Sequence, residues 1–413
     1  MHKIKIGDFF SQIRTWGVRG LWDAACRWPH EHRVAAFLKK SMEDNANTIP
    51  QKGITIVAPI SGCYSLSKTM RDFIVRLKVV GIPHQVFDTF TSGRKVQDDV
   101  YKPLLTPKDK FNILKYEYVV EMLNSPIPSG LKLKRCRIAF WESESGILDV
   151  FPYLQDSDIV IAMSDFNATY FRKVFPRNVI VSKVVYPLMA LPNDIPSRTE
   201  ARQKYGFRED DFLVFFNFDL KAIWRKNPEG LIRAFAMAFH KCDNAKLVLK
   251  TNNANLCADK LYSLQNLAKS LGVESQVIFV NDYVSSSEIY ALTGACDVYA
   301  SLHRGEGFGL GIAEAMQMGK AVVATAYSAP LEFCKQDNAI LVPYKLIKTN
   351  DDSLSSKFGY CADADVDFAA SALRRLYGDR KLVAKLGKNA KQFVETHFSD
   401  EEFKTSVLKL IEE

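Results

Sequence analysis

The sequence lacks the cysteine and histidine patterns of disulfide-bonded and zinc-binding proteins. Its eight cysteines are scattered over 413 residues, with no C-x-x-C pair and no close Cys/His spacing. They are therefore expected to be free thiols in a reducing compartment. The sequence also lacks a signal-peptide pattern and any apolar stretch long enough to span a bilayer. These absences exclude a disulfide scaffold and a transmembrane protein, and they predict a cytoplasmic location.

Several nucleotide- and metal-binding signatures are missing as well. The turn from Pro59 to Ser65 contains one glycine, Gly62, which argues against the G-x-G-x-x-G fingerprint of an NAD-dependent oxidoreductase. No Asp-x-Asp metal motif is present, so we predict no essential metal. The net charge of +8 is diffuse, and no basic stripe with interleaved aromatic residues occurs. This pattern argues against a nucleic-acid partner but fits an anionic substrate or a membrane surface.

The chain is long enough for two domains of comparable size. A short apolar strand at 53–59 is followed by a helical pattern that ends near Gly81, and then by a second strand at 82–90. This β-α-β opening predicts an α/β fold built on a parallel, doubly wound sheet. Residues 91–135 give no clear pattern, and the Pro-containing stretch 190–198 is the predicted linker.

The most informative stretch is a glycine-rich turn between a strand and a helix. An apolar run at 297–302 predicts the strand, glycines occupy positions 305, 307, 309 and 311, and a helical pattern then continues to Gly319. Such a turn aims the free N–H groups of a helix start at an anion. Glu306 lies in the turn and Glu314 lies more than one helical turn later, so the two carboxylates are expected to flank one ligand.

The sequence around these two glutamates, Glu306–Gly–Phe–Gly–Leu and Glu314–Ala–Met, resembles the E-x7-E signature of family 4 glycosyltransferases. The flanking stretches 281–283, 297–299 and 319–325 are similar to that family too. The resemblance implies the GT-B fold, in which two Rossmann-like domains face each other across a cleft. It also implies a retaining transfer of a sugar from a nucleotide-diphosphate sugar, with no cofactor beyond this donor.

The resemblance assigns the residues that bind the donor. Glu314 would hold the ribose and Tyr283 would contact the base, whereas Glu306 would lie near the transferred sugar. The diphosphate would lie between the two walls of the cleft, beside Gly62 of the first domain and the turn of the motif. That turn consists of Gly307, Phe308, Gly309 and Leu310.

Cations are expected beside the diphosphate because they stabilise the charge that grows on a leaving group. Lys226 has the family's lysine position relative to the helix that follows it. Phe218–Asp219 stand where the family has Gly-Arg, so Arg225 or Lys221 would supply the second cation. The alternative, surface bases at a helix start, conflicts with the helix dipole. Glu142 stands where many members have a histidine, and it is either a group that binds or deprotonates the acceptor or a solvated loop acid.

The predicted domain organisation combines the sequence patterns with the resemblance. Residues 51–190 would form an N-terminal Rossmann-like domain that binds the acceptor, and residues 200–390 a C-terminal Rossmann-like domain that binds the donor. Residues 391–413 would form a helix that returns to the first domain, as in the family. Residues 1–50 would form a helical extension.

The predicted function is transfer of a hexose to a hydroxyl of a glycan or lipid-linked acceptor, in cell-surface polysaccharide or glycoconjugate synthesis. These substrates are common in the family, but the sequence does not identify the base of the donor, its sugar or the acceptor. Two mechanisms are compatible with retention. In one, Glu306 forms a covalent adduct with the sugar; in the other, the acceptor attacks on the same face of the donor from which the diphosphate leaves. One alternative is a sugar phosphorylase or sucrose-type synthase of similar fold. Another is a catalytically silent binding subunit, against which the intact Glu306, Glu314 and Lys226 argue.

The N-terminal extension is a candidate for peripheral contact with the inner face of a membrane. Between Met1 and Lys40, eight Lys and Arg residues outweigh three acids. Apolar residues recur there at near-helical spacing, namely Phe9, Phe10, Ile13, Trp16, Leu21 and Trp22. A basic amphipathic segment of this kind can lie in a membrane interface. The alternative is a pair of helices packed on the first domain.

If the extension docks on membranes, the full chain should co-sediment with liposomes that contain anionic lipid, whereas a variant lacking residues 1–45 should stay in the supernatant. Attraction between the basic segment and anionic headgroups is the reason, so the binding should weaken at high salt. Equal sedimentation of the two proteins would contradict membrane docking and favour packed helices.

Overall fold

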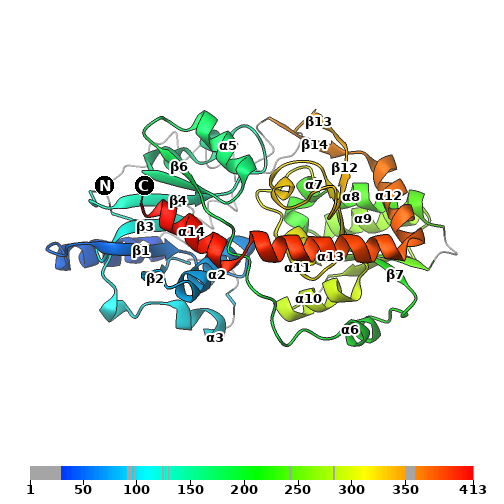
Figure 1. Cartoon of the computed structure of the whole chain (residues 1–413), viewed down its shortest axis with the longest axis horizontal. Coiled ribbons are helices and arrows are strands. Elements are labelled where there is room, and N and C mark those ends of the chain that lie inside the picture. Colours follow the sequence, from blue (N-terminus) through cyan, green and yellow to red (C-terminus); the bar gives the residue numbers. More distant parts are fainter. Residues whose placement is uncertain are drawn as a thin grey trace.

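The computed structural model describes residues 29–90, 95–96, 98–122, 125, 127–128, 130–240, 244–281, 284–349 and 359–412. Figure 1 shows two α/β domains arranged along the long axis of the molecule, with the first strand and the last helix on the same domain. Each domain is built on a six-stranded sheet. The two Rossmann-like domains that the sequence predicts are therefore confirmed.

The first domain contains a parallel sheet with the strand order β2-β1-β3-β4-β5-β6. Its strands are β1 (Gln51–Ala58), β2 (His84–Asp88), β3 (Tyr116–Met122), β4 (Lys134–Ala139), β5 (Ile159–Ala162) and β6 (Ile180–Lys183). Its helices are α2 (Ser65–Val79), α3 (Asp98–Tyr101), α4 (Ile147–Val150) and α5 (Asp165–Val174), with 3-10 turns at Lys102–Leu104, Lys108–Lys110 and Pro152–Asp156. β1 is buried continuously from Gly53 to its end, as expected of a strand covered on both faces. The predicted β-α-β opening corresponds to β1, α2 and β2.

Strand β3 lies in the stretch that gives no clear sequence pattern. Its Glu121 side chain is fully buried, and Oε1 of this carboxylate lies 2.8 Å from Nε of Arg137 and 2.5 Å from Nε of Arg135, both on β4. A buried charge is tolerated because these cations pair with it. The acid interrupts the apolar run of the strand, and its partners come from a different strand, so periodicity alone does not reveal β3.

The second domain repeats this architecture with the strand order β12-β11-β10-β7-β8-β9. Its strands are β7 (Phe212–Asp219), β8 (Ala245–Asn252), β9 (Val277–Val280), β10 (Val298–Ser301), β11 (Ala321–Thr325) and β12 (Ile340–Val342). Its helices are α6 (Arg198–Lys204), α7 (Ile223–Lys226), α8 (Pro228–Ala238), α9 (Ala258–Ser270), α10 (Ser286–Ala295), α11 (Leu310–Gln317) and α12 (Val366–Gly378), with 3-10 turns at Leu220–Ala222 and Ala329–Glu332. An antiparallel pair, β13 (Tyr344–Lys348) and β14 (Tyr360–Ala364), stands apart from the main sheet.

Both sheets reverse their strand order at one point, between β1 and β3 in the first domain and between β7 and β10 in the second. In open α/β sheets, ligands bind outside the carboxyl ends of the strands at such points. The turn after β1 and the glycine-rich turn after β10 both begin there. The topology thus directs one loop from each domain toward a shared site.

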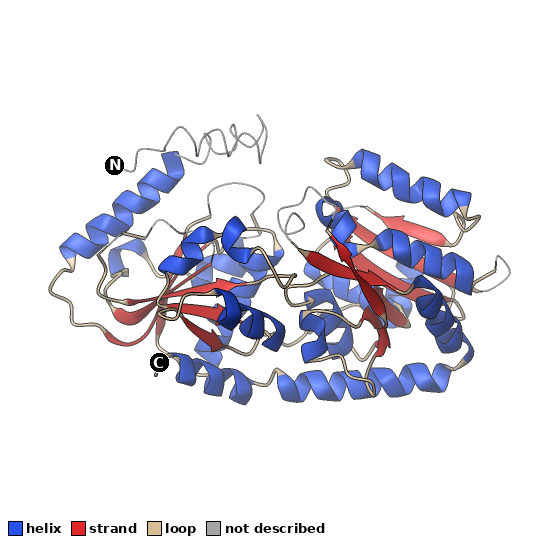
Figure 2. Cartoon of the chain, turned by 90° about the horizontal axis from the view of Figure 1, so that it is seen from above, coloured by secondary structure: helices blue, strands red, loops and turns tan. Residues whose placement is uncertain are grey.

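The chain passes between the domains twice. The first passage follows β6, and the second joins α13 (Arg380–His397), which packs on β11 and α11, to α14 (Asp400–Leu410), which packs on α2 and β6. Figure 2 shows these two helices in a row beneath both domains. Arg76 of α2 fixes the junction, because it donates to the carbonyl oxygen of Phe398 at 2.6 Å and pairs with Asp400 at 2.8 Å.

A helix over residues 29–44 precedes the first strand. Val34 and Leu38 of this helix are buried in an apolar cluster with Val57, Phe87 and Phe111. The described end of the N-terminal extension therefore packs on the first domain, as Figure 2 also shows. The apolar residues from Phe9 to Trp22 lie outside the described residues. Among the helices described, none is long and apolar enough to cross a membrane.

We expect Phe403→Ala to destabilise the protein by about 3–5 kcal/mol, the usual cost of truncating a buried phenylalanine. The Phe403 ring is fully buried, and its centroid lies 5.5 Å from that of Phe73 in an edge-on contact. Chemical denaturation followed by circular dichroism measures the change. Leu408→Ala on the same helix is the control, because this side chain is 37% exposed and should cost little. Equal effects of the two variants would contradict the docking of α14.

Candidate active site

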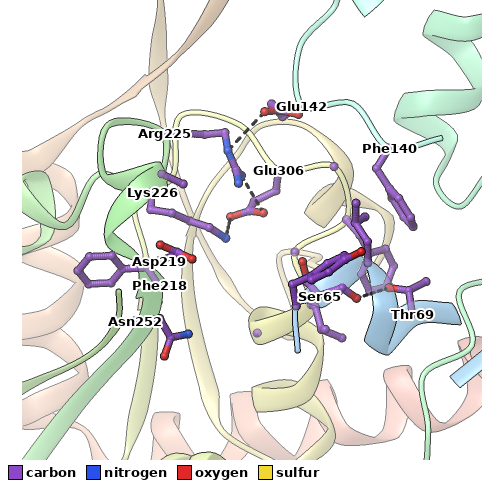
Figure 3. A pocket seen from close by; sticks show the side chains of 18 of the residues that line it. Ser65, Thr69, Phe140, Glu142, Phe218, Asp219, Arg225, Lys226, Asn252 and Glu306 are labelled. Carbon is purple, nitrogen blue, oxygen red and sulfur yellow. Dashed lines mark hydrogen bonds and ion pairs between the residues drawn. The ribbon is translucent and has the colours of Figure 1, made fainter. Parts of the chain in front are cut away.

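A cavity of about 1060 Å³ lies between the two domains, at the carboxyl ends of both sheets. The first domain lines it with the turn 63–66 and the segment 138–142, and the second lines it with the ends of β7 and β8 and with the glycine turn 306–311. Figure 3 shows the two walls, with Arg225, Lys226 and Glu306 on the second domain and Ser65, Thr69 and Phe140 on the first.

The glycines of the turn let the two domains approach each other. A Cβ atom at Gly305 would overlap the carbonyl oxygen of Glu142, and one at Gly307 would lie 3.0 Å from Cβ of Phe140. Gly309 has a φ of 92°, a left-handed conformation that glycine adopts without strain, and it immediately precedes α11. The first N–H groups of α11 have no acceptor within the helix, and they lie at the cavity wall.

Glu306 is the centre of a buried ion network. Its Oε1 pairs with Nζ of Lys226, and its Oε2 lies 3.2 Å from Nη1 of Arg225. Arg225 also reaches across the cleft, where its Nε lies 3.4 Å from Oε1 of Glu142. Burial alone would raise the pKa of Glu306, but the charges of Lys226 and Arg225 outweigh it and hold this pKa at about 2. Glu306 is therefore ionised at neutral pH, with both oxygens engaged.

The two cations are held by a short helix of their own. Arg225 and Lys226 end α7, and Asn227 follows in a left-handed conformation with a φ of 52°. The Asn227 side chain accepts from the N–H of Gly230 at 3.1 Å and donates to the carbonyl oxygen of Leu302 at 2.9 Å. This single side chain caps α8 and ties the cations to the glycine turn. The cations lie at the carboxyl end of α7 and directly before the cap of α8.

Glu314 belongs to a second ion network, which also crosses the cleft. Its Oε1 accepts a hydrogen bond from the Tyr290 hydroxyl at 2.9 Å and lies 3.4 Å from Nζ of Lys68, a residue of α2 in the first domain. The same Lys68 ammonium lies 2.7 Å from Oδ2 of Asp72. Burial would lower the pKa of Lys68, but Glu314 and Asp72 together raise it. Lys68 is thus a cation that joins the two domains at the cavity.

Of the other predicted site residues, some line the cavity and some do not. Gly62 does not line the cavity, although the turn residues directly after it do, and its carbonyl oxygen accepts a hydrogen bond from Arg71 at 2.8 Å. Lys221 is not among the lining residues either, whereas Phe218–Asp219 are. Tyr283 lies outside the described residues. The predicted turn does line the cavity, with Gly307, Phe308, Gly309 and Leu310.

Several lining residues were not predicted individually from the sequence, although Asn281 belongs to the flanking stretch 281–283. Asparagines stand at the carboxyl ends of three adjacent strands, namely Asn217 in β7, Asn252 in β8 and Asn281 after β9. Asn217 accepts a hydrogen bond from the Tyr299 hydroxyl at 2.7 Å. Their position at strand ends is a signal that the sequence contained. Lys68 and Tyr290 carried no such signal, because their contacts come from the approach of separate elements.

The two parallel sheets and the cleft between them define the GT-B fold. Residues 197–393 match the family described as glycosyl transferases group 1. EpsD of Bacillus subtilis (strain 168), whose name assigns it to the glycosyltransferases, is 29% identical over 193 residues. That match covers 46% of this chain and 43% of EpsD, so it spans less than half of the relative. The matched segment contains the E-x7-E motif, and the resemblance to family 4 glycosyltransferases is confirmed.

Solved structures show the same architecture over nearly the whole chain. Sucrose-phosphate synthase from Thermosynechococcus elongatus has a TM-score of 0.65 at 15% identity, covering 87% of this chain and 98% of that one. HepE of Anabaena, in complex with UDP and glucose, has a TM-score of 0.61 at 16% identity, covering 88% and 100%. WaaG, a glycosyltransferase involved in lipopolysaccharide biosynthesis, has a TM-score of 0.58 at 16% identity, covering 87% and 98%. At these identities the likeness establishes the fold.

We expect Gly305→Ala to lower turnover about a hundredfold, because the added Cβ meets the backbone of Glu142 and a displacement of roughly 1 Å in a reactive site costs about that much. If the protein uses a nucleotide-sugar, release of nucleoside diphosphate measures turnover. Gly378→Ala is the control, since a Cβ built there meets no atom within 4 Å apart from its chain neighbours and the backbone of its own helix, and its turnover should match the unsubstituted protein. Normal turnover of Gly305→Ala would show that the walls do not need this close approach.

Proposed function

We propose that the protein transfers a sugar from a nucleotide-diphosphate sugar to an acceptor hydroxyl, with retention at the anomeric carbon. The observation that carries this proposal is the buried arrangement of Glu306 with Lys226 and Arg225 beside the start of α11. Two cations and a helix N-terminus can stabilise a negatively charged diphosphate as it leaves, and the neighbouring carboxylate can stabilise the positive charge that develops on the sugar. The family assignment of residues 197–393 supports the same reaction.

The leaving diphosphate would lie between two helix starts. On the second domain, Lys226, Arg225 and the first N–H groups of α11 would neutralise its charge. On the first domain, α2 begins after Tyr64 without a side-chain cap, and its first residues line the cavity. Its free N–H groups would therefore face the same anion. The cations are already placed before the donor arrives, because Glu306 holds them, so little reorganisation accompanies bond cleavage.

The two motif glutamates would have separate roles. Glu314 would hold the ribose hydroxyls. Glu306 would stabilise positive charge at the anomeric centre through its field, because both of its oxygens are paired and its pKa is about 2. A carboxylate with such strong partners is a poor nucleophile, which favours reaction on one face of the donor over a covalent adduct.

The acceptor would bind against the first domain. Glu142 lies at the cavity, 3.4 Å from Arg225, so its carboxylate could bind or deprotonate the attacking hydroxyl next to the leaving group. Partly exposed rings of Phe140, Phe151 and Tyr153 line the same wall. Such rings suit the apolar faces of sugar units. We therefore propose a hexose donor and a glycan or lipid-linked glycan acceptor in cell-surface polysaccharide synthesis, a setting similar to the one stated for WaaG.

A thermal-shift panel of UDP-, GDP-, ADP- and dTDP-sugars tests the donor class, because a ligand raises the melting temperature in proportion to its affinity for the folded state. UDP-glucose is the first probe, since HepE has been solved with it. One base should stabilise the protein well above the others. A protein that no nucleotide-sugar stabilises would contradict the proposal.

With the selected donor, Lys226→Met should lower the rate of nucleotide release about 100- to 1,000-fold, the usual loss when one group that stabilises transition-state charge is removed. Lys221→Met is the matched control, because Lys221 is an exposed cation five positions away that does not line the cavity. Near-normal turnover of Lys226→Met would remove Lys226 from the reaction. Stabilisation by a donor without turnover in the unsubstituted protein would favour a silent binding subunit.

A further inference from the structure

Lys68 is the first-domain cation that touches the predicted ribose site. It is the fourth residue of α2, so it lies one turn from the helix start that borders the cavity. Asp72 is placed one turn later on the same face, and its carboxylate holds the Lys68 ammonium at 2.7 Å. The Lys68 side chain is 26% exposed, against 13% for Asp72. The Asp72 carboxylate, on the same helix, therefore holds the Lys68 ammonium where it faces the second domain.

The Glu314 carboxylate is held at one oxygen by partners from both domains. Its Oε1 accepts from the Tyr290 hydroxyl of α10 at 2.9 Å and lies 3.4 Å from the Lys68 ammonium. Among the described residues, no side chain or backbone group makes a hydrogen bond to Oε2 of Glu314. Glu314 also lines the cavity. The carboxylate is thus fixed through one oxygen, while the other is available to a ligand hydroxyl.

An aromatic contact beside this pair keeps the start of α2 at the cleft. The Thr69 hydroxyl, next to Lys68 in the chain, lies 2.8 Å from the hydroxyl of Tyr186. The Tyr186 ring stacks on Phe308 of the glycine turn, with centroids 3.7 Å apart and planes 10° apart. The position of Lys68 relative to Glu314 is therefore set by a packed contact between the domains as well as by charge.

We propose that Lys68 is a positioning residue for Glu314: it orients the carboxylate toward the ribose hydroxyls of the donor and so makes ribose recognition depend on the approach of the two domains. This inference rests on the proposed donor class and on the ribose role of Glu314. Without Lys68, Glu314 and Asp72 would be two acids without the cation between them, and the carboxylate would be free to turn away from the cavity.

The test compares the affinity of UDP with that of 2′-deoxy-UDP by calorimetry, with the GDP or ADP pair in their place if the thermal-shift panel selects that base. A hydroxyl bonded to a correctly oriented carboxylate contributes about tenfold in affinity, the size of one charge-assisted hydrogen bond. The unsubstituted protein should show this preference for the ribonucleotide. Lys68→Met should reduce it about tenfold, so that both nucleotides bind alike.

Three further variants make the outcome decisive. Lys68→Arg keeps the charge and should retain most of the preference, whereas Lys68→Gln keeps polarity without charge and should lose it, which guards against a folding defect in the methionine variant. Lys78→Met removes an exposed cation at the far end of α2 and should behave as the unsubstituted protein. An unchanged preference in Lys68→Met and Lys68→Gln would overturn the inference, and Lys68 would then merely join the domains.

Glu314→Gln separates this failure from a failure of the proposed function. If Glu314→Gln abolishes the preference and the two neutral Lys68 variants do not, the ribose role stands and the positioning role of Lys68 is wrong. If Glu314→Gln leaves the preference intact, Glu314 does not bind the ribose, and the inference fails together with that part of the proposed function.

Discussion

The burial of one carboxylate against two cations at a domain boundary constrains the structure around it. Taking charges out of water costs several kcal/mol for each ion unless geometry and hydrogen bonds offset the loss. Glu306, Lys226 and Arg225 meet this condition because α7 and the glycine turn hold them in one arrangement. Asn227 caps the next helix while bonding the turn, and Gly305 leaves space for the opposite wall. Each of these local features contacts the elements that hold the ion network.

Glu306 and Glu314 are only eight positions apart, yet their carboxylates have different electrostatic environments. Glu306 faces two cations of its own domain, and its pKa is held at about 2. Glu314 faces one lysine, which is shared with Asp72, and a tyrosine hydroxyl. The first environment keeps a carboxylate permanently charged and engaged, whereas the second leaves an oxygen available to a ligand. The same residue type therefore has two different electrostatic surroundings within one turn and helix.

Much of the fold could be predicted because its signals are local. The apolar strands, the glycine turn and the helix after it are encoded by neighbouring residues, and the two α/β domains follow from them. Strand β3 was not recognised, because Glu121 breaks its apolar run and the compensating arginines lie on β4. The short helix α7, which ends at Arg225 and Lys226, was not predicted, because four residues are too few to show a helical period.

At the site, the resemblance to a family supplied the motif residues, but their partners across the cleft were beyond the sequence. Glu142 was identified as a residue without a settled role, and its contact with Arg225 exists because the domains meet. The same holds for Lys68, since no spacing within α2 indicates that the helix faces Glu314. Contacts between the two domains depend on the shapes of their surfaces, and the sequence pattern within one domain does not predict these shapes.

The two passages of the chain between the domains have a mechanical consequence. One passage lies between β6 and α6, and the other lies between α13 and α14, where Arg76 clamps Phe398 and Asp400. Two covalent attachment points define a line, so the easiest relative motion of the domains is a rotation about that line, with little sliding or twisting. Groups far from this axis travel furthest during opening, and those close to it hardly move. The two connections therefore favour a single hinge motion, and the ion pairs that cross the cleft would break or form together as the domains rotate.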